Sequence, residues 1–232
     1  MVVGLVMGRK GSVSFPGKNM YPVCGRPMSE WVILNAKHSL IDEVVITTDD
    51  PDLKDLGREH GCTVIDRPAE LCTKEALGED VFKHAYDQIH SDKIGMYVIM
   101  MCNAPTFLPR HIDRGIFLLL QDESLDSACT LSKFNWYAPN RARRLDNGLV
   151  APFSAGMATG TCDRDSSGDC YFYDCCVAVV RPKCFEEIEE GQPPQRWLGK
   201  RIAPIENQGG LDVDEAWQIP MVEGYLNRHG LV

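Results

Sequence analysis

The sequence predicts an α/β fold in which a mostly parallel sheet is covered by helices on both faces. Strand-like apolar runs alternate with helix-like segments of about ten residues between residues 2 and 132, an alternation typical of parallel strands joined by crossover helices. The chain has 232 residues, so it is long enough to form one large domain with its own hydrophobic core.

The first strand is predicted at Val2–Met7, where a continuous apolar run indicates burial on both faces. Further short apolar runs predict strands at Glu43–Thr48, Thr63–Ile65, Gly95–Met101 and Ser127–Ser132. Between these runs, apolar residues at helical spacing predict helices at Ser29–Ser39, Asp52–His60, Leu77–Ile89 and Pro109–Leu120. In this order the elements predict a Rossmann-like three-layer sandwich.

The second half of the chain is less regular. Residues 134–170 are rich in Arg, Asn, Gly and Asp and show little periodicity, so we expect an irregular excursion from the sheet. Strand character returns at Tyr171–Val180, and a final helix is predicted at Asp214–Asn227. Because no repeat or Gly/Ser linker divides the chain, a single domain over residues 1–232 is expected.

Composition argues against several classes of function. The net charge of -9 disfavours a surface for nucleic acid or for an anionic membrane, and no apolar stretch approaches the roughly 20 residues that span a bilayer. The ten cysteines form no CxxC pair and no zinc pattern, so mostly buried thiols are expected rather than a zinc site or a disulfide framework. With no signal peptide ahead of the first strand, we expect a cytoplasmic protein.

The loop after the first strand has the composition of an anion site. Arg9 and Lys18 supply positive charge, while Gly11 and Gly17 allow backbone N–H groups to approach a phosphate. In an open parallel sheet, ligands bind beyond the carboxyl ends of the strands, which is where this loop lies. The loop matches neither a P-loop nor a dinucleotide-binding fingerprint, so a surface turn with scattered cations is a second interpretation.

The same loop resembles the signature of a known enzyme family. Residues 9–19 follow the pattern R-x-G-S-x-x-x-P-x-K-N, which is similar to that of the cytidylyltransferases that activate acidic sugars, the CMP-sialic acid and CMP-3-deoxy-manno-octulosonate synthetases. Four further segments resemble motifs of this family in the same order: Cys24–Met28, Thr47–Asp50, Arg67–Leu71 and Leu211–Asp214.

The resemblance implies that a substrate oxygen attacks the α-phosphorus of CTP and that pyrophosphate leaves. Such a reaction asks a protein mainly for positioning and for neutralisation of charge. Arg9 and Lys18 match the cations that bind the triphosphate, and with Asp212 they are the implied catalytic residues. The other implied nucleotide contacts are Gly11, Ser12, Asn19 and Arg67. For Arg67, a salt bridge to an acidic neighbour is an alternative.

Asp212 and Asp214 are the candidate ligands for Mg²⁺, the cofactor that the resemblance implies. In an extended segment, side chains two residues apart point to the same face, so both carboxylates could meet one hard cation. Magnesium would then offset the charge that develops on the leaving pyrophosphate. The alternative is structural, because Asp214 also suits the N-cap of the last predicted helix.

The acceptor region is where the chain departs from the family pattern. Asn103 stands where octulosonate enzymes carry a metal-binding Asp, and it is predicted to contact substrate. In the excursion, Arg141, Arg143 and Arg164 suit an acidic acceptor, although a solvated or dimer-facing cluster is equally open. The resemblance implies a homodimer in which this excursion closes the partner's site. A nonulosonic or octulosonic sugar acid is the expected acceptor; a small phosphonate, or a nucleotide-binding homologue without turnover, are the alternatives.

Overall fold

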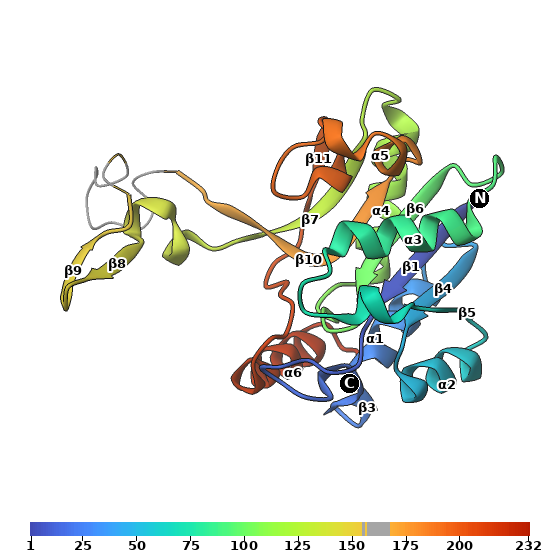
Figure 1. Ribbon diagram of the computed structural model, residues 1–232, viewed down its shortest axis with the longest axis horizontal. Helices are drawn as coiled ribbons and strands as arrows, with labels where there is room; N and C mark the ends of the chain where they lie inside the picture. The colour runs from blue at the N-terminus through green and yellow to red at the C-terminus, as the bar shows by residue number, and fades with distance from the viewer. Residues whose placement is uncertain (155, 157–167) are drawn as a thin grey trace.

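A seven-stranded sheet forms the centre of the molecule, with strands in the order β11-β7-β10-β6-β1-β4-β5. The computed structural model describes residues 1–154, 156 and 168–232. The strands of the sheet are β1 (Val2–Met7), β4 (Glu43–Thr48), β5 (Thr63–Asp66), β6 (Met96–Met101), β7 (Ser127–Lys133), β10 (Tyr171–Val180) and β11 (Ile202–Glu206). Figure 1 shows helices packed against both faces of this sheet.

The sheet is mostly parallel, as predicted. Each neighbouring pair runs parallel except where β10 lies between β6 and β7, to both of which it is antiparallel. The edge strand β11 was not among the strands expected from the sequence. Its Pro204 lowers strand propensity, but a proline is tolerated at an edge, where one side of the strand has no partner to receive an N–H.

Six helices surround the sheet in the described part of the chain. They are α1 (Met28–Lys37), α2 (Pro51–Glu59), α3 (Gly78–Ile89), α4 (Pro109–Gln121), α5 (Lys183–Glu186) and α6 (Ile219–Arg228). Short 3₁₀ turns lie at Lys18–Met20, Ala69–Cys72, Asn135–Tyr137, Pro139–Arg141, Ile188–Glu190, Arg196–Leu198 and Ala216–Gln218. Two very short strands, β2 (Pro22–Val23) and β3 (Arg26–Pro27), form a separate pair.

Alternation along β1 shows how the three layers arise. Val6 packs in a core cluster with residues of α1, α2 and α4, whereas Val3 and Leu5 pack in a second cluster with residues of α3 and α5. Successive side chains of a strand point to opposite faces, so a wholly apolar strand needs a cover on each side. The predicted three-layer sandwich is therefore confirmed. A third cluster joins α1 and α6 to the loop after β1.

The excursion at residues 134–170 is more regular than expected in its outer part. Residues 143–152 form a hairpin of β8 (Arg143–Asp146) and β9 (Leu149–Pro152). Its two-residue turn is Asn147-Gly148, both with positive φ, which is the sequence that a primed hairpin turn favours. The expectation of an irregular segment is thus wrong for these residues.

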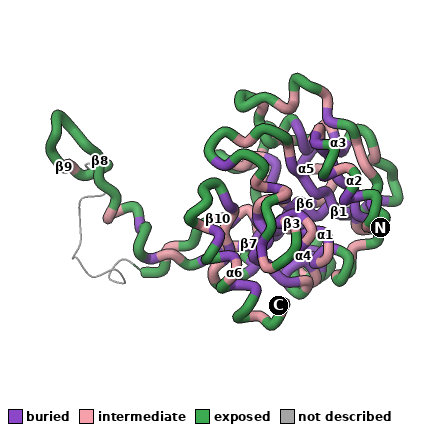
Figure 2. The backbone as a smooth tube through the Cα atoms, turned by 90° about the horizontal axis from the view of Figure 1, so that it is seen from below, coloured by how far each residue is buried: buried purple, intermediate pink, exposed green. Residues whose placement is uncertain are grey.

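We call residues 134–154, which project from the body, the arm (Figure 1). Figure 2 shows that its outer part is largely exposed. Leu145 is 84% exposed and Leu149 is 73% exposed, so the hairpin presents apolar side chains that nothing within the described chain covers. Dimerisation through the arm remains a prediction.

The last helix begins five residues later than predicted. α6 starts at Ile219, after the 3₁₀ turn at Ala216–Gln218. The side-chain oxygen of Gln218 accepts the backbone N–H groups of Asp214 and Glu215. These bonds hold the segment before α6 in a turn, and Asp214 is not the N-cap of the helix.

The cysteines in the described residues are buried or half-buried. All nine that the structure describes are free thiols, five of them buried and four half-buried; Cys162 lies outside the described residues. No three His, Cys, Asp or Glu side chains in the described ranges are arranged to hold a metal by themselves. None of the helices in those ranges is long and apolar enough to cross a membrane.

Candidate active site

Close packing around Gly8 and a hydrogen bond from the buried amide of Asn19 hold the two ends of the loop after β1. A Cβ atom on Gly8 would lie 2.8 Å from Asn19 Nδ2 and 2.8 Å from Cys102 Sγ, so only glycine lets the loop leave the sheet at this point. Asn19 is buried, and its Nδ2 donates to the carbonyl of Arg9 at 3.1 Å. The sequence-predicted nucleotide residue Asn19 thus holds the loop closed.

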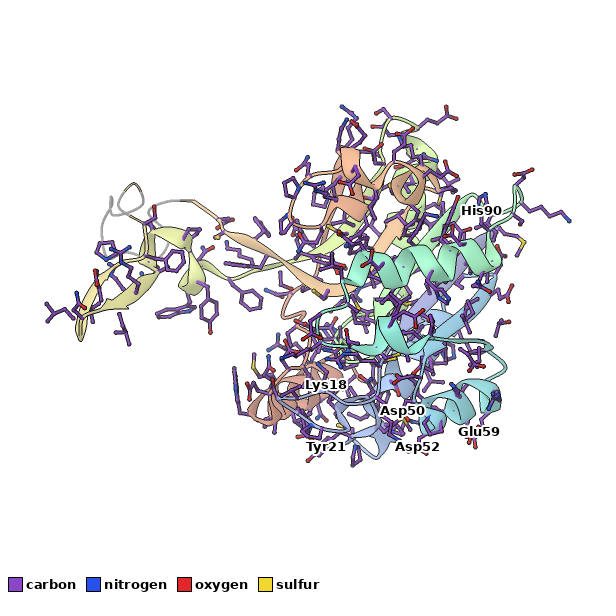
Figure 3. The ribbon with its side chains drawn as sticks, viewed as in Figure 1. Lys18, Tyr21, Asp50, Asp52, Glu59 and His90 are labelled. Atoms are coloured by element: carbon purple, nitrogen blue, oxygen red, sulfur yellow. The ribbon has the colours of Figure 1, made fainter. Side chains whose placement is uncertain are left out.

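A cavity of about 680 Å³ lies between this loop, the end of β6 and the segment before α6. Predicted residues that line it are Arg9, Ser12, Lys18, Asn19, Arg67, Asn103 and Asp214. Gly11 lines an adjoining cavity of about 300 Å³ together with Asp50 and Asp52. In Figure 3, Lys18 lies at the same end of the molecule as these two aspartates, while His90 lies at the other end. Motifs from distant parts of the sequence therefore meet in one place.

Two arginines at the cavity donate hydrogen bonds to the backbone of neighbouring elements. Arg9 donates from one guanidinium nitrogen to the carbonyls of Gly11 at 3.2 Å and Cys72 at 3.3 Å. Arg67 is 8% exposed and donates to the carbonyl of Thr47 at 2.7 Å. The loop and the Arg67–Leu71 motif are thereby drawn together around the cavity.

The environment of Arg67 differs from the salt bridge that was the alternative. Burial lowers the pKa of its guanidinium, and its Nε has no hydrogen-bond partner among the described residues. The neighbouring carboxylate of Asp66 pairs instead with Lys54, at 2.7 Å. A buried guanidinium with an unused donor at a cavity wall is suited to an anionic ligand.

An ion pair joins the two halves of the site. Lys18 Nζ lies 2.7 Å from Asp214 Oδ1 and donates to the carbonyl of Val213 at 2.9 Å. Asn103 holds the same segment through two hydrogen bonds. Its side-chain Nδ2 donates to the Val213 carbonyl at 2.9 Å, and its backbone carbonyl accepts the Val213 N–H at 2.7 Å. Asn103 thus positions the residue between the two candidate metal ligands.

Negative charge at this segment is not fully balanced. Burial and the neighbouring charge of Asp214 raise the pKa of the Asp212 carboxyl, and no described Lys, Arg or His forms an ion pair with Asp212. Magnesium is commonly held by one or two carboxylates, with water and substrate phosphates completing its shell. A half-buried carboxylate beside a second one, with a deficit of positive charge, fits that requirement. Asp212 itself does not line the cavity around Arg9 and Lys18.

The described arginines that were predicted to bind the acceptor do not lie at this cavity. The Arg141 guanidinium lies 5.7 Å from the centre of the Trp136 ring, and Arg143 donates to the carbonyls of Asn140 and Ala142. Both belong to the arm and line no part of the cavity. Arg164 lies outside the described residues.

Sequence reasoning missed two charged residues at the cavity. Lys74 and Glu215 also line it. Lys74 follows the Arg67–Leu71 motif by three residues, so a cation close behind a nucleotide-contacting motif was the available signal. Glu215 follows Asp214 directly, but its position depends on the turn that Gln218 maintains.

Comparison with known proteins finds similarity to cytidylyltransferases. A family model described as cytidylyltransferase matches residues 3–132, more than half of the chain. A 3-deoxy-manno-octulosonate cytidylyltransferase of Bdellovibrio bacteriovorus is 30% identical over 128 residues, which are 55% of this chain and 49% of the relative. An N-acylneuraminate cytidylyltransferase of Escherichia coli is 23% identical over 135 residues, 58% of this chain and 32% of the relative. The chain therefore aligns with at most about half the length of these relatives.

Solved structures share the fold at low sequence identity. A CMP:2-keto-3-deoxy-manno-octonic acid synthetase complexed with CTP has a TM-score of 0.73 at 16% identity, with 98% of this chain and 99% of that chain covered. A 4-diphosphocytidyl-2C-methyl-D-erythritol synthase from Anaerococcus prevotii has a TM-score of 0.61 at 13% identity, with 98% and 96% covered. At these identities the likeness concerns the fold.

Proposed function

We propose that this chain, which belongs to the cytidylyltransferase family, transfers the CMP group of CTP to an acidic sugar and releases pyrophosphate. The observation that carries the proposal is the convergence of Arg9, Lys18 and Arg67 on one cavity, bounded on its other side by Asp214. On a chain whose net charge is -9, such a concentration of cations needs a local reason, and a triphosphate supplies one.

The residues at the cavity suit the demands of this reaction. A hydroxyl group of the acceptor loses its proton to solvent as its oxygen forms a bond to the α-phosphorus. The bond from that phosphorus to the bridging oxygen breaks, and pyrophosphate leaves with the electron pair of that bond. Arg9 and Lys18 bind the phosphates and offset the charge on the leaving group. Arg67 contributes a donor that is already desolvated, so it needs little reorganisation when the nucleotide binds.

The proposed cofactor is Mg²⁺, with Asp212 and Asp214 as the protein ligands. When bound, the ion supplies positive charge to the phosphate oxygens. The chain's own contribution is to hold this segment: Lys18 and Asn103 both bind the Val213 carbonyl between the two aspartates. In this proposal Asn103 is a positioning residue, because its amide is committed to the backbone of Val213.

The proposed acceptor is a sugar acid of the nonulosonic or octulosonic class. The relatives support this class, since they are a 3-deoxy-manno-octulosonate cytidylyltransferase and an N-acylneuraminate cytidylyltransferase. We further propose that the protein is a homodimer and that the arm carries Arg141 and Arg143 to the partner's site. The exposed apolar side chains of the arm support that role, because they need a cover. We also propose a cytoplasmic location, because the described cysteines are free thiols and thiols persist in a reducing compartment such as the cytoplasm.

The test is a pyrophosphate-release assay in the presence of Mg²⁺, run with each nucleoside triphosphate and with a panel of sugar acids and small phosphonates. We expect release with CTP and a sugar acid only. Release with a phosphonate instead would replace the acceptor class and keep the reaction. Tighter binding of a purine triphosphate than of CTP in calorimetry would refute the nucleotide assignment. CTP binding without release for any acceptor would indicate a nucleotide-binding homologue.

A further inference from the structure

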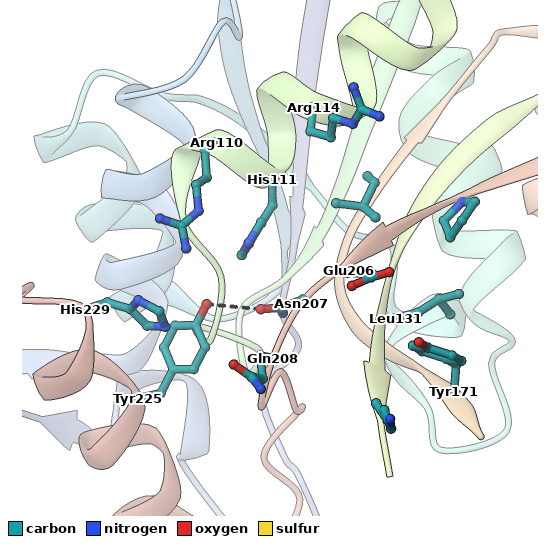
Figure 4. A pocket seen from close by; sticks show the side chains of 13 residues that line it. Arg110, His111, Arg114, Leu131, Tyr171, Glu206, Asn207, Gln208, Tyr225 and His229 are labelled. Atoms are coloured by element: carbon teal, nitrogen blue, oxygen red, sulfur yellow. Dashed lines mark hydrogen bonds between the residues drawn. The ribbon is translucent and has the colours of Figure 1, made fainter. Parts of the chain in front are cut away.

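A second large cavity lies on the α4 side of the sheet, between α4, α6 and the end of β11 (Figure 4). Its volume is about 760 Å³, within the range of about 300–1,000 Å³ that is typical of small-molecule sites. None of its lining residues lines the cavity around Arg9 and Lys18. The proposed transfer reaction therefore does not explain it.

Arg110 places an unbalanced positive charge in this cavity. Figure 4 shows its guanidinium directed toward His229 and the hydroxyl end of Tyr225. The Arg110 side chain has no ion-pair or hydrogen-bond partner among the described residues. Burial is the largest cause of the lowered pKa values of His111 and His229, and the positive charge of Arg110 is the second largest.

His111 places an unused hydrogen-bond donor beside that charge. The residue is 8% exposed, and its Nδ1 accepts the backbone N–H of Leu108 at 3.2 Å. A ring whose Nδ1 is an acceptor carries its proton on Nε2. Figure 4 shows the ring extending into the cavity, and Nε2 has no partner within the described residues. Although the residue as a whole is buried, Nε2 is accessible from the cavity, so an oxygen of a ligand bound there can accept its N–H.

The rest of the cavity wall carries further cations and several hydrogen-bond acceptors. Arg114 lies one helical turn beyond Arg110 and also has no ion-pair partner in the described part of the chain. Glu206 and Gln208 lie toward the β11 side of the cavity. The Tyr225 hydroxyl is already committed, since it donates to Asn207 Oδ1 at 3.1 Å. Lys133 of β7 also lines this wall but pairs with Asp169. The two arginines without an ion-pair partner among the described residues thus stand at the α4 side, whereas Glu206 and Gln208 offer hydrogen-bond acceptors at the other.

We propose that this cavity binds a metabolite-sized ligand through one oxyanion group, a phosphate or a carboxylate, held by the Arg110 guanidinium and the Nε2–H of His111. Hydroxyl or amino groups of the same ligand would meet Glu206. Exposed arginines on a helix are commonly solvated, but two features distinguish this case. The arginine faces a cavity, and the adjacent His111, whose ring extends into the same cavity, is a residue more than nine-tenths buried.

Histidine side-chain NMR on the full-length ¹⁵N-labelled protein tests the proposal. Inorganic phosphate and malonate are titrated separately at constant ionic strength, and the imidazole signal of His111 is assigned with His111→Gln. We expect a saturable shift of His111 with at least one of the two anions, at low-millimolar concentration or below. His38, which is exposed and does not line the cavity, is not expected to show a saturable shift. A response to phosphate alone or to malonate alone identifies the source of the oxyanion.

Two matched variants and one independent variant sharpen the test. Arg110→Gln should weaken the anion's affinity at least tenfold, whereas Arg228→Gln removes the same charge from α6 outside the cavity and should bind as the wild type does. Arg9→Ala should leave the His111 response unchanged, so the outcome does not depend on the proposed transfer reaction. The proposal is overturned if His111 shows no saturable shift with either anion. It is also overturned if Arg110→Gln responds like the wild type, or if Arg9→Ala abolishes the response.

Discussion

Two polar regions at the carboxyl edge of the sheet differ in how completely their groups are paired. Beneath the surface, the carboxylate of Asp174, which is 4% exposed, accepts bonds from the hydroxyls of Thr130 and Ser132, the amide of Asn207 and the backbone N–H of Cys176. By contrast, Arg67 at the cavity around Arg9 has an unused buried donor, and Asp212 in the segment before α6 has no cationic partner among the described residues. A saturated polar cluster holds a structure, whereas an unsaturated one is available to a ligand.

The saturated cluster also positions the unsaturated one. Asn207 donates to the Thr106 carbonyl at 2.8 Å, and the Thr106 hydroxyl is bonded to both the N–H and the carbonyl of Leu211. A Cβ on Gly210 would lie 2.1 Å from Asp174 Oδ2, so the chain can pass this point only as glycine. Buried hydrogen bonds from Thr106 and the cluster around Asp174 therefore hold the segment that leads to Asp212.

The largest effect is expected for Asp212→Asn. We expect kcat for pyrophosphate release to fall by about a thousandfold, because loss of a metal's charge stabilisation removes several kcal/mol from the transition state. The melting temperature of the metal-free protein should stay level or rise. The pKa of Asp212 is raised in the fold by burial and by Asp214, so its ionised form opposes folding at pH values above its ordinary pKa. A large drop in melting temperature would instead assign Asp212 a structural role.

The second effect is expected on stability alone. Asp174→Ala leaves several buried donors without an acceptor, and each such group costs about 1–3 kcal/mol, so the free energy of unfolding should fall by about 3 kcal/mol or more. Urea denaturation measures the change. Asp146→Ala on the arm, where the carboxylate is exposed, is the control and should change stability by less than about 0.5 kcal/mol. An equally small change for Asp174→Ala would show that the buried cluster is not saturated in solution.

The third prediction concerns acid stability and the cavity beside α4. Burial first, then Arg110, lower the pKa of His111 from 6.5 to about 4, so the unfolded chain takes up its proton at a higher pH than the folded chain does. The stabilisation from neutral His111 is present above pH 6.5 and is lost as the pH falls toward 4, by up to about 3 kcal/mol. Urea denaturation of the wild type and of His111→Gln over this pH range should show the steeper loss in the wild type. Parallel curves for the two proteins would contradict the lowered pKa.

The smallest effects are expected for the loop after β1. Arg9→Ala and Lys18→Ala should each cost about 1.5–3 kcal/mol, the usual scale of a charge-assisted contact, and mostly in kcat because charge grows on the leaving pyrophosphate. Lys10→Ala should be nearly silent, since Lys10 lines the smaller adjoining cavity but not the one bounded by Arg67 and Asp214, and its backbone N–H is bonded to Asp49. A set in which Lys10 matters and Arg9 does not would place the triphosphate on the other side of the loop.

Much of the candidate site could be predicted because its residues lie in short motifs. Arg9, Lys18 and Asn19 fall within eleven consecutive residues, and Arg67 belongs to a motif of five. What could not be predicted is the part each plays in holding the site together. Asn19 bonds to the backbone of Arg9 and Asn103 to that of Val213, and no pattern in the sequence distinguishes such a backbone contact from a contact to substrate.

By itself the sequence determined the alternating strands and helices, the parallel core of the sheet and the cationic loop that follows β1. These features are local, because apolar periodicity and glycine positions act over a few residues. Only the tertiary structure decided that Lys18 meets Asp214, 196 residues away, that Pro204 lies in an edge strand, and that Arg110 and His111 face an open cavity while Asp174 is buried with its bonds complete. Those outcomes depend on which elements pack side by side, and burial then determines which polar groups find partners and which are left for a ligand.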